Sequence, residues 1–72
     1  MLQQVKIDGP YITLGQLLKK LDLAHSGGFV KIFLQEVEVR VNREPESRRG
    51  RKLYPQDIVD IAGYGSVQVI GE

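Results

Sequence analysis

The 72-residue sequence has no cysteine, no tryptophan and a single histidine, His25. The lack of cysteine excludes a disulfide framework, and one histidine leaves too few soft ligands for a structural zinc site. A chain of this length buries only about 60% of the surface that it exposes when unfolded. Packing must therefore provide the stability of the fold.

Long hydrophobic runs are also absent. No apolar run reaches the roughly 20 residues of a membrane span, and the first residues, MLQQVKIDG, lack the basic start and apolar middle of a signal peptide. We therefore expect a cytoplasmic protein without a membrane partner. With 42% hydrophobic residues, and without a repeat, low-complexity tract or linker, the chain is expected to form a single domain over residues 1–72.

Net charge is small, at +1, but the charges are unevenly distributed. Residues 40–52 contain six basic and two acidic residues, whereas the rest of the chain contains four basic and seven acidic residues. A one-sided basic segment suits docking on a polyanion, with a solvated loop as the alternative that charge alone leaves open. In either case we expect the segment to be exposed. The basic cluster within it comprises Arg48, Arg49, Arg51 and Lys52.

A short strand and two amphipathic helices are predicted in the first half of the chain. The alternation in QVKI predicts the strand, and DGPY predicts the turn after it. Thr13 and Gln16 have the spacing of a capping box, and Ser26 is a second candidate N-cap. Apolar residues recur at helical spacing after each cap, at Leu14, Leu17, Leu18 and Leu21 and then at Phe29, Val30, Phe33, Leu34 and Val37. The predicted core shared by the two helices is Leu17, Leu21, Phe33 and Leu34.

In the second half of the chain the apolar period changes to two. Val37, Val39 and Val41 alternate with polar residues, which predicts a strand with Arg40 facing away from the core. NREP predicts a turn, the basic segment after it is irregular, and LYPQD predicts another turn. DIVDI and SVQVI predict strands joined by the turn AGYGS. One strand, two helices and three or four strands make an α+β fold.

Catalytic constellations are weak in this sequence. His25 and Ser26 are adjacent and Asp22 is near, but neighbours in a loop between helices rarely meet as nucleophile, base and orienting group. GYGSVQ lacks the third glycine and the following helix of a dinucleotide-binding motif. Asp57 and Asp60 lie three apart on a predicted strand and so point to opposite faces. We therefore expect no enzyme activity, no metal site and no cofactor.

Several pieces of the chain together resemble the RNA-binding domain named after ribosomal small-subunit protein S-four. They are LDLAHS, VKIFL, VRVN and QDIVDI, within residues 11–61. With VKID, YITLGQLLK, SGG and SRRGRKL, the chain is similar to the short stand-alone bacterial YaaA-type members of that family. The resemblance implies an αL motif, in which a two-helix hairpin packs against a small, mostly antiparallel sheet. It also implies that the second helix and the following hairpin face RNA.

The sequence departs from the family pattern at positions that concern RNA contacts. Gly27 stands where the family has an arginine after the capping serine, Lys31 replaces a second arginine, and Arg43 replaces the turn glycine. The basic cluster is our candidate replacement for the arginine missing at position 27. Tyr54, beside the cluster, is interpreted as the edge of the core and not as a base-stacking residue. The candidate RNA-binding residues are Lys31, Gln35, Arg43, Arg48, Arg49, Arg51 and Lys52.

The expected partner is a structured RNA, bound through its phosphates and its shape by a monomer, in ribosome assembly or translation. Two alternatives remain open. A protein-binding adaptor fits the size but leaves the basic cluster unexplained. TLGQLLKKL, VRVNRE and QDIVDIAG are also similar to parts of the β-grasp sulfur carriers, but those proteins act through a terminal Gly-Gly, whereas this chain ends in VIGE.

Overall fold

Two helices and two sheets surround one hydrophobic core in the computed structural model, which describes residues 2–71. The larger sheet has the strand order β1-β7-β6-β3-β4 and the smaller one pairs β2 with β5. The helices are α1 (Leu14–Lys20) and α2 (Gly27–Glu36). The strands are β1 (Leu2–Lys6), β2 (Ile12–Thr13), β3 (Val39–Val41), β4 (Glu44–Pro45), β5 (Lys52–Leu53), β6 (Ile58–Ile61) and β7 (Gly65–Ile70).

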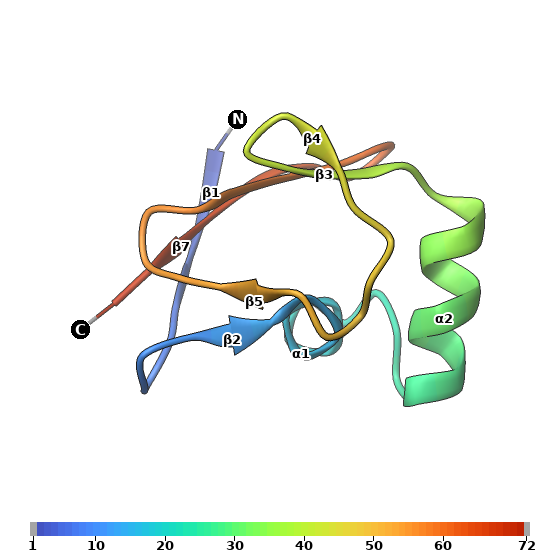
Figure 1. Ribbon diagram of the computed structural model, residues 1–72, viewed down its shortest axis with the longest axis horizontal. Helices are drawn as coiled ribbons and strands as arrows, with labels where there is room; N and C mark the ends of the chain where they lie inside the picture. Colours follow the sequence, from blue (N-terminus) through green and yellow to red (C-terminus); the bar gives the residue numbers. More distant parts are fainter. Residues whose placement is uncertain (1, 72) are drawn as a thin grey trace.

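The larger sheet covers one side of the core, and α1 lies on the other side beside the small sheet (Figure 1). The helix α2 stands at one end of the molecule (Figure 1). The strand β1 pairs with β7 in parallel, and the other pairings of the larger sheet are antiparallel. Alternate residues of β3, β6 and β7 point inward, as the period of two predicts. The α+β class predicted from the sequence is confirmed.

Both predicted helix caps are present. The Thr13 hydroxyl accepts the N–H of Gln16, and the Gln16 side chain accepts the N–H of Thr13, which completes the capping box of α1. Ser26 caps α2 by accepting the N–H of Phe29. Both caps were predictable because they involve residues only three positions apart.

Of the four residues predicted to form the core between the helices, two are buried and two are partly buried. Leu17 of α1 and Leu34 of α2 are buried, whereas Leu21 and Phe33 are only partly buried against the cluster. Phe29 was expected in the apolar stripe of α2, but more than half of its side chain is exposed. The reason is helical geometry: Phe29 lies about 100° around the helix from Val30, the buried residue of that turn.

The structure has more strands than the sequence predicted. Residues 42–45 were expected to form a turn and residues 46–53 to be irregular, but β4 lies in the first range and β5 in the second, and β2 precedes α1. Each of these strands has two residues, so neither an alternating pattern nor a propensity signal is long enough to be detected. The strands β2 and β5 form by pairing with each other across about forty residues, with Ile12 opposite Leu53 and Thr13 opposite Lys52, whereas β4 pairs with the neighbouring β3.

The predicted turn after β3 is a tight two-residue connection. Val41 pairs with Glu44, and the two residues between them, Asn42 and Arg43, have φ angles of 50° and 72°. Positive φ at both positions is the geometry of a type I′ hairpin turn, which favours Asn-Gly. The arginine at the glycine position does not prevent this turn, because Arg43 takes the left-handed conformation.

Replacing Arg43 with glycine should therefore stabilise the protein by about 0.5–1 kcal/mol. The left-handed conformation costs a residue with a side chain about 1–2 kcal/mol, and the greater freedom of glycine in the unfolded chain offsets part of that gain. Thermal melting should show a rise of a few degrees. Arg40→Gly, in the extended strand β3, is the control and should lower the melting temperature. A lower melting temperature for Arg43→Gly would contradict the strain argument.

Candidate nucleic-acid interface

The basic segment is bound to the start of α1 through its backbone. The N–H of Leu14 donates to the carbonyl of Arg51 at 2.9 Å, and the N–H of Gly15 donates to the carbonyl of Arg49 at 2.8 Å. A Cβ atom at Gly15 would lie 3.3 Å from the Arg49 carbonyl oxygen, so glycine permits this close approach. The segment is therefore a fixed part of the fold, not a loose loop.

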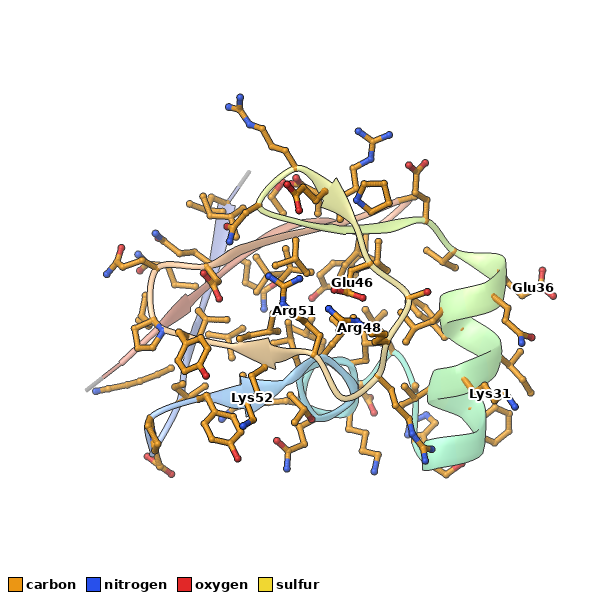
Figure 2. The ribbon with its side chains drawn as sticks, viewed as in Figure 1. Lys31, Glu36, Glu46, Arg48, Arg51 and Lys52 are labelled. Atoms are coloured by element: carbon orange, nitrogen blue, oxygen red, sulfur yellow. The ribbon has the colours of Figure 1, made fainter. Side chains whose placement is uncertain are left out.

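Glu46 binds two of the four side chains of the basic cluster. Arg48 donates to both of its carboxylate oxygens, at 3.0 and 3.1 Å, and Arg51 donates to one of them at 2.7 Å. The backbone N–H groups of Ser47 and Arg48 donate to the same carboxylate at 3.1 Å. In Figure 2 the two arginines converge on Glu46 in the space between the larger sheet and α1.

The Glu46 carboxylate is held in its charged form. Its side chain is only 7% exposed. The hydrogen bonds from Arg48 and then from Arg51 outweigh this burial and lower the pKa of Glu46 from 4.5 to about 2. The same pairing raises the pKa of Arg48. Arg51 is 30% exposed, which corrects the expectation that the whole basic cluster faces solvent.

Arg49 extends to the beginning of α2. One of its guanidinium nitrogens lies 3.5 Å from the carbonyl oxygen of Gly27, at the outer limit of a hydrogen bond. The same nitrogen lies 3.1 Å from the position that a Cβ atom of residue 27 would occupy. The structure thus brings an arginine of the basic cluster to the helix start at which the sequence has glycine.

A groove of about 230 Å³ separates the starts of the two helices. We call it the interhelix groove, and its lining includes Gln16, Lys19, Gly27, Arg49 and Gly50. Lys19 was not among the residues predicted to bind RNA. It is exposed, and the groove places it on the same surface as Arg49.

Lys31 and Gln35 lie on the exposed side of α2, one and two turns after Gly27. In Figure 2 Lys31 projects from the half of α2 that begins the helix. None of the ion pairs formed within residues 2–71 involves Lys19, Lys31 or Arg49. These three cations are available for a ligand.

Lys52 and Arg43 lie apart from the interhelix groove. The ammonium of Lys52 is 5.0 Å from the centre of the Tyr11 ring. Arg43 borders a separate hollow with Asn42, Ile58 and Asp60. The seven predicted residues therefore fall into different environments. Of these seven, only Arg49 lies at the start of α2, and Lys31 and Gln35 lie one and two turns further along that helix.

Two aromatic side chains beside Lys52 are more exposed than the sequence indicated. Tyr54 is 48% exposed, so its interpretation as the edge of the core was wrong. It lies next to Tyr11, with the ring centres 6.0 Å apart. Tyr11 gave no signal in the sequence because its neighbour Tyr54 is more than forty positions away.

A second exposed surface is apolar. Phe29 and Ile32 of α2 are each more than half exposed. They border a hollow of about 250 Å³ with Leu23, His25 and other residues on the flank of α2 away from the interhelix groove. The sequence did not distinguish this flank from the buried one, because both are apolar.

The described residues contain neither a cluster of metal-binding side chains nor a membrane-spanning helix. Within residues 2–71, no three His, Asp or Glu side chains are grouped so that they could hold a metal ion. No helix in the same range has the length and apolar character needed to cross a membrane.

Comparison with known proteins places the chain in a family. The model of the S4 domain family matches residues 5–70. The chain is also similar to a Bacillus subtilis (strain 168) protein named "Probable ribosome maturation protein RlbA". The two sequences are 56% identical over 70 residues, which cover 97% of this chain and 99% of that protein. This chain belongs to the S4 domain family.

Proposed function

We propose that this protein binds a structured RNA across the interhelix groove and takes part in ribosome maturation, without enzyme activity. Lys19, Lys31 and Arg49 contact phosphates, and Gln35 adds a neutral hydrogen-bonding group on the same helix face. Such contacts fix the protein on the RNA by the shape of its backbone, because phosphates carry no sequence information.

The observation that carries the proposal is the position of Arg49 at the start of α2. Its guanidinium lies beside the Gly27 carbonyl, where Lys31 follows one turn later and Lys19 lines the opposite side of the groove. Lys19 and Arg49 thus line one concave surface, and Lys31 lies one turn along α2 from Gly27, which also lines it. None of the three forms an ion pair within residues 2–71. A concave basic surface attracts a polyanion more strongly than the same charges spread over a convex one.

The other arginines of the basic cluster have a different task in this proposal. Arg48 and Arg51 neutralise Glu46 and fix the loop, so that the Arg49 side chain points to α2. The two helices act as the αL motif of the family, with their starts toward the RNA. The name of the B. subtilis relative supports ribosome maturation as the process.

Salt dependence tests the electrostatic part of the proposal. With Lys52 included, about four phosphates are neutralised, so raising the salt from 50 to 200 mM should weaken RNA binding roughly 50- to 150-fold. Fluorescence anisotropy with a labelled ribosomal RNA hairpin measures this slope. The same titration with potassium glutamate separates cation effects from anion effects. A flat salt response, or no binding at 50 mM salt, would reject the proposal.

A protein-binding adaptor remains the second candidate, and the exposed Phe29 and Ile32 favour it. These side chains lie on the flank of α2 away from the interhelix groove, so a protein contact there is compatible with RNA binding. Ile32→Ser should leave RNA affinity unchanged if the two surfaces are independent. Loss of co-sedimentation with ribosomal particles in the same variant would support the adaptor function.

A further inference from the structure

The small sheet presents an aromatic surface to solvent. In β2 and β5, Ile12 pairs with Leu53 and Thr13 pairs with Lys52. The same register continued by one position sets Tyr11 opposite Tyr54. Because side chains alternate along a strand, Ile12 and Leu53 face the core, while the tyrosines, Thr13 and Lys52 share the outer face.

The two rings on this face are accessible and close together. Tyr11 is 41% and Tyr54 is 48% exposed, and the ring planes are inclined at 53°. Lys52 holds its ammonium above the Tyr11 ring, 5.0 Å from its centre. We call Tyr11, Tyr54 and Lys52 the tyrosine platform. In Figure 2 Lys52 projects from the small sheet on the side away from the larger sheet.

We infer that the tyrosine platform binds an unpaired nucleotide of the RNA, with its base stacked on the tyrosine rings and its phosphate on Lys52. This inference rests on the proposed RNA binding and adds the class of nucleotide that the protein requires. Aromatic rings bind unpaired bases of any sequence, because every base has a π-face, and a neighbouring cation binds the backbone. A paired base within a helix has no free face to offer.

Charge complementarity favours a nucleotide over an uncharged partner. Lys52 directly follows Arg51, so the platform continues the basic segment that lines the interhelix groove. The nearby carboxylate of Asp57 is bound within the protein, since it accepts from the Asn42 side chain at 3.1 Å and from the N–H of Tyr54 at 2.8 Å. That second bond also fixes the backbone that carries the Tyr54 ring.

A comparison with the third tyrosine of the chain separates a binding role from a structural one. Tyr64 is as exposed as Tyr11, at 41%, but its hydroxyl donates to the Gln3 side chain at 2.8 Å and ties β1 to the turn before β7. Within residues 2–71, no side-chain hydrogen bond involves the hydroxyl of Tyr11 or Tyr54. Tyr64 is therefore the matched control.

The test compares two RNA probes on the same protein samples. One probe is a hairpin with an open loop of uridines, and the other is a blunt duplex of the same stem. The double variant Tyr11→Leu/Tyr54→Leu should bind the hairpin about tenfold more weakly, because it loses stacking with at least one base. Its affinity for the duplex should be unchanged. Tyr64→Leu should bind both probes like the wild type, and Tyr54→Trp should retain the preference for the hairpin.

A measurement on the wild type makes the test independent of variant folding. Addition of oligouridylate should shift the ring proton resonances of Tyr11 and Tyr54 upfield, through the ring current of a stacked base, and leave those of Tyr64 in place. Equal affinities of wild type and double variant for the hairpin, or unshifted resonances, would overturn the inference. In that case, loss of duplex binding in a variant of Lys31 and Arg49 would still support the proposed function, whereas a wild type that binds neither probe rejects both.

Discussion

Replacing Glu46 with glutamine should lower the free energy of unfolding by about 1–2 kcal/mol at pH 7. The pKa of Glu46 falls from 4.5 to about 2 in the folded protein, and one pKa unit corresponds to about 1.4 kcal/mol, but water screens the pair with Arg48, whose side chain is 73% exposed. Glutamine keeps the size of the side chain but cannot balance the guanidinium groups of Arg48 and Arg51. A domain of this size has little stability in reserve. We expect a large drop in melting temperature or an unfolded protein.

The contribution of Glu46 also has a defined pH dependence. Its folded pKa lies below its unfolded pKa, so the stabilisation is fully present above about pH 4.5 and is lost as the pH falls toward 2. Urea unfolding at pH 7 and at pH 3 should therefore show a smaller difference for Glu46→Gln than for the wild type. Effects of pH that are common to the two proteins cancel in this comparison.

Glu38→Gln is the matched control for Glu46→Gln. Glu38 also pairs with an arginine, Arg40, at 2.7 Å, but both side chains are more than half exposed. Exposed pairs contribute about 0–1 kcal/mol, so this variant should melt close to the wild type. Equal losses for the two variants would mean that the arginines at Glu46 are no better fixed than a surface pair. The interpretation that Glu46 fixes the basic segment through Arg48 and Arg51 would then be wrong.

Neutralising the three cations in and beside the interhelix groove should nearly abolish RNA binding without unfolding the protein. Lys19, Lys31 and Arg49 are each exposed, and their charges are not used within residues 2–71. Each phosphate contact adds about one unit to the salt slope, which corresponds to about tenfold in affinity at 50 mM salt. The triple change to glutamine should therefore weaken binding about a thousandfold. It should also reduce the salt slope by about three.

A control variant with the same change in net charge separates the groove from charge in general. Lys6, Lys20 and Arg40 are exposed and lie outside the residues that line the groove. Their triple change to glutamine should reduce affinity much less, through the long-range field alone. Anisotropy and thermal melting are to be measured on the same samples. If the groove variant melts normally and binds like the control variant, the groove is not the RNA site.

The Glu46 variant and the triple variant test different roles for the residues of the basic cluster, which charge alone did not distinguish. From the sequence, Arg48, Arg49, Arg51 and Lys52 formed one group of four equivalent cations. The structure assigns two of them to a buried carboxylate, one to the start of α2 and one to an aromatic ring. Neutralising all four at once would therefore mix a loss of stability with a loss of binding.

Local features of this protein were determined by the sequence by itself. The capping box at Thr13, the N-cap at Ser26 and the apolar periods of the helices and of β3, β6 and β7 all depend on residues within one or two turns of each other. The α+β class follows from the order of these elements, and the family resemblance from the motifs LDLAHS, VKIFL, VRVN and QDIVDI. The sequence also shows directly that most of the basic residues lie in one segment, residues 40–52.

Only the tertiary structure decided which side chains meet. Gly27 and Arg49, Tyr11 and Tyr54, and Ile12 and Leu53 are each more than twenty positions apart, and no periodicity connects them. Glu46 is close in sequence to its arginines, but its position depends on β3, where its N–H donates to the Val39 carbonyl, and on the end of α2, with which it lines a hollow. Hydrogen bonds to a charged partner and burial together set the energy of a charge, and both depend on the folded geometry. The sequence therefore located the basic surface, and the fold divided it into structural and available charges.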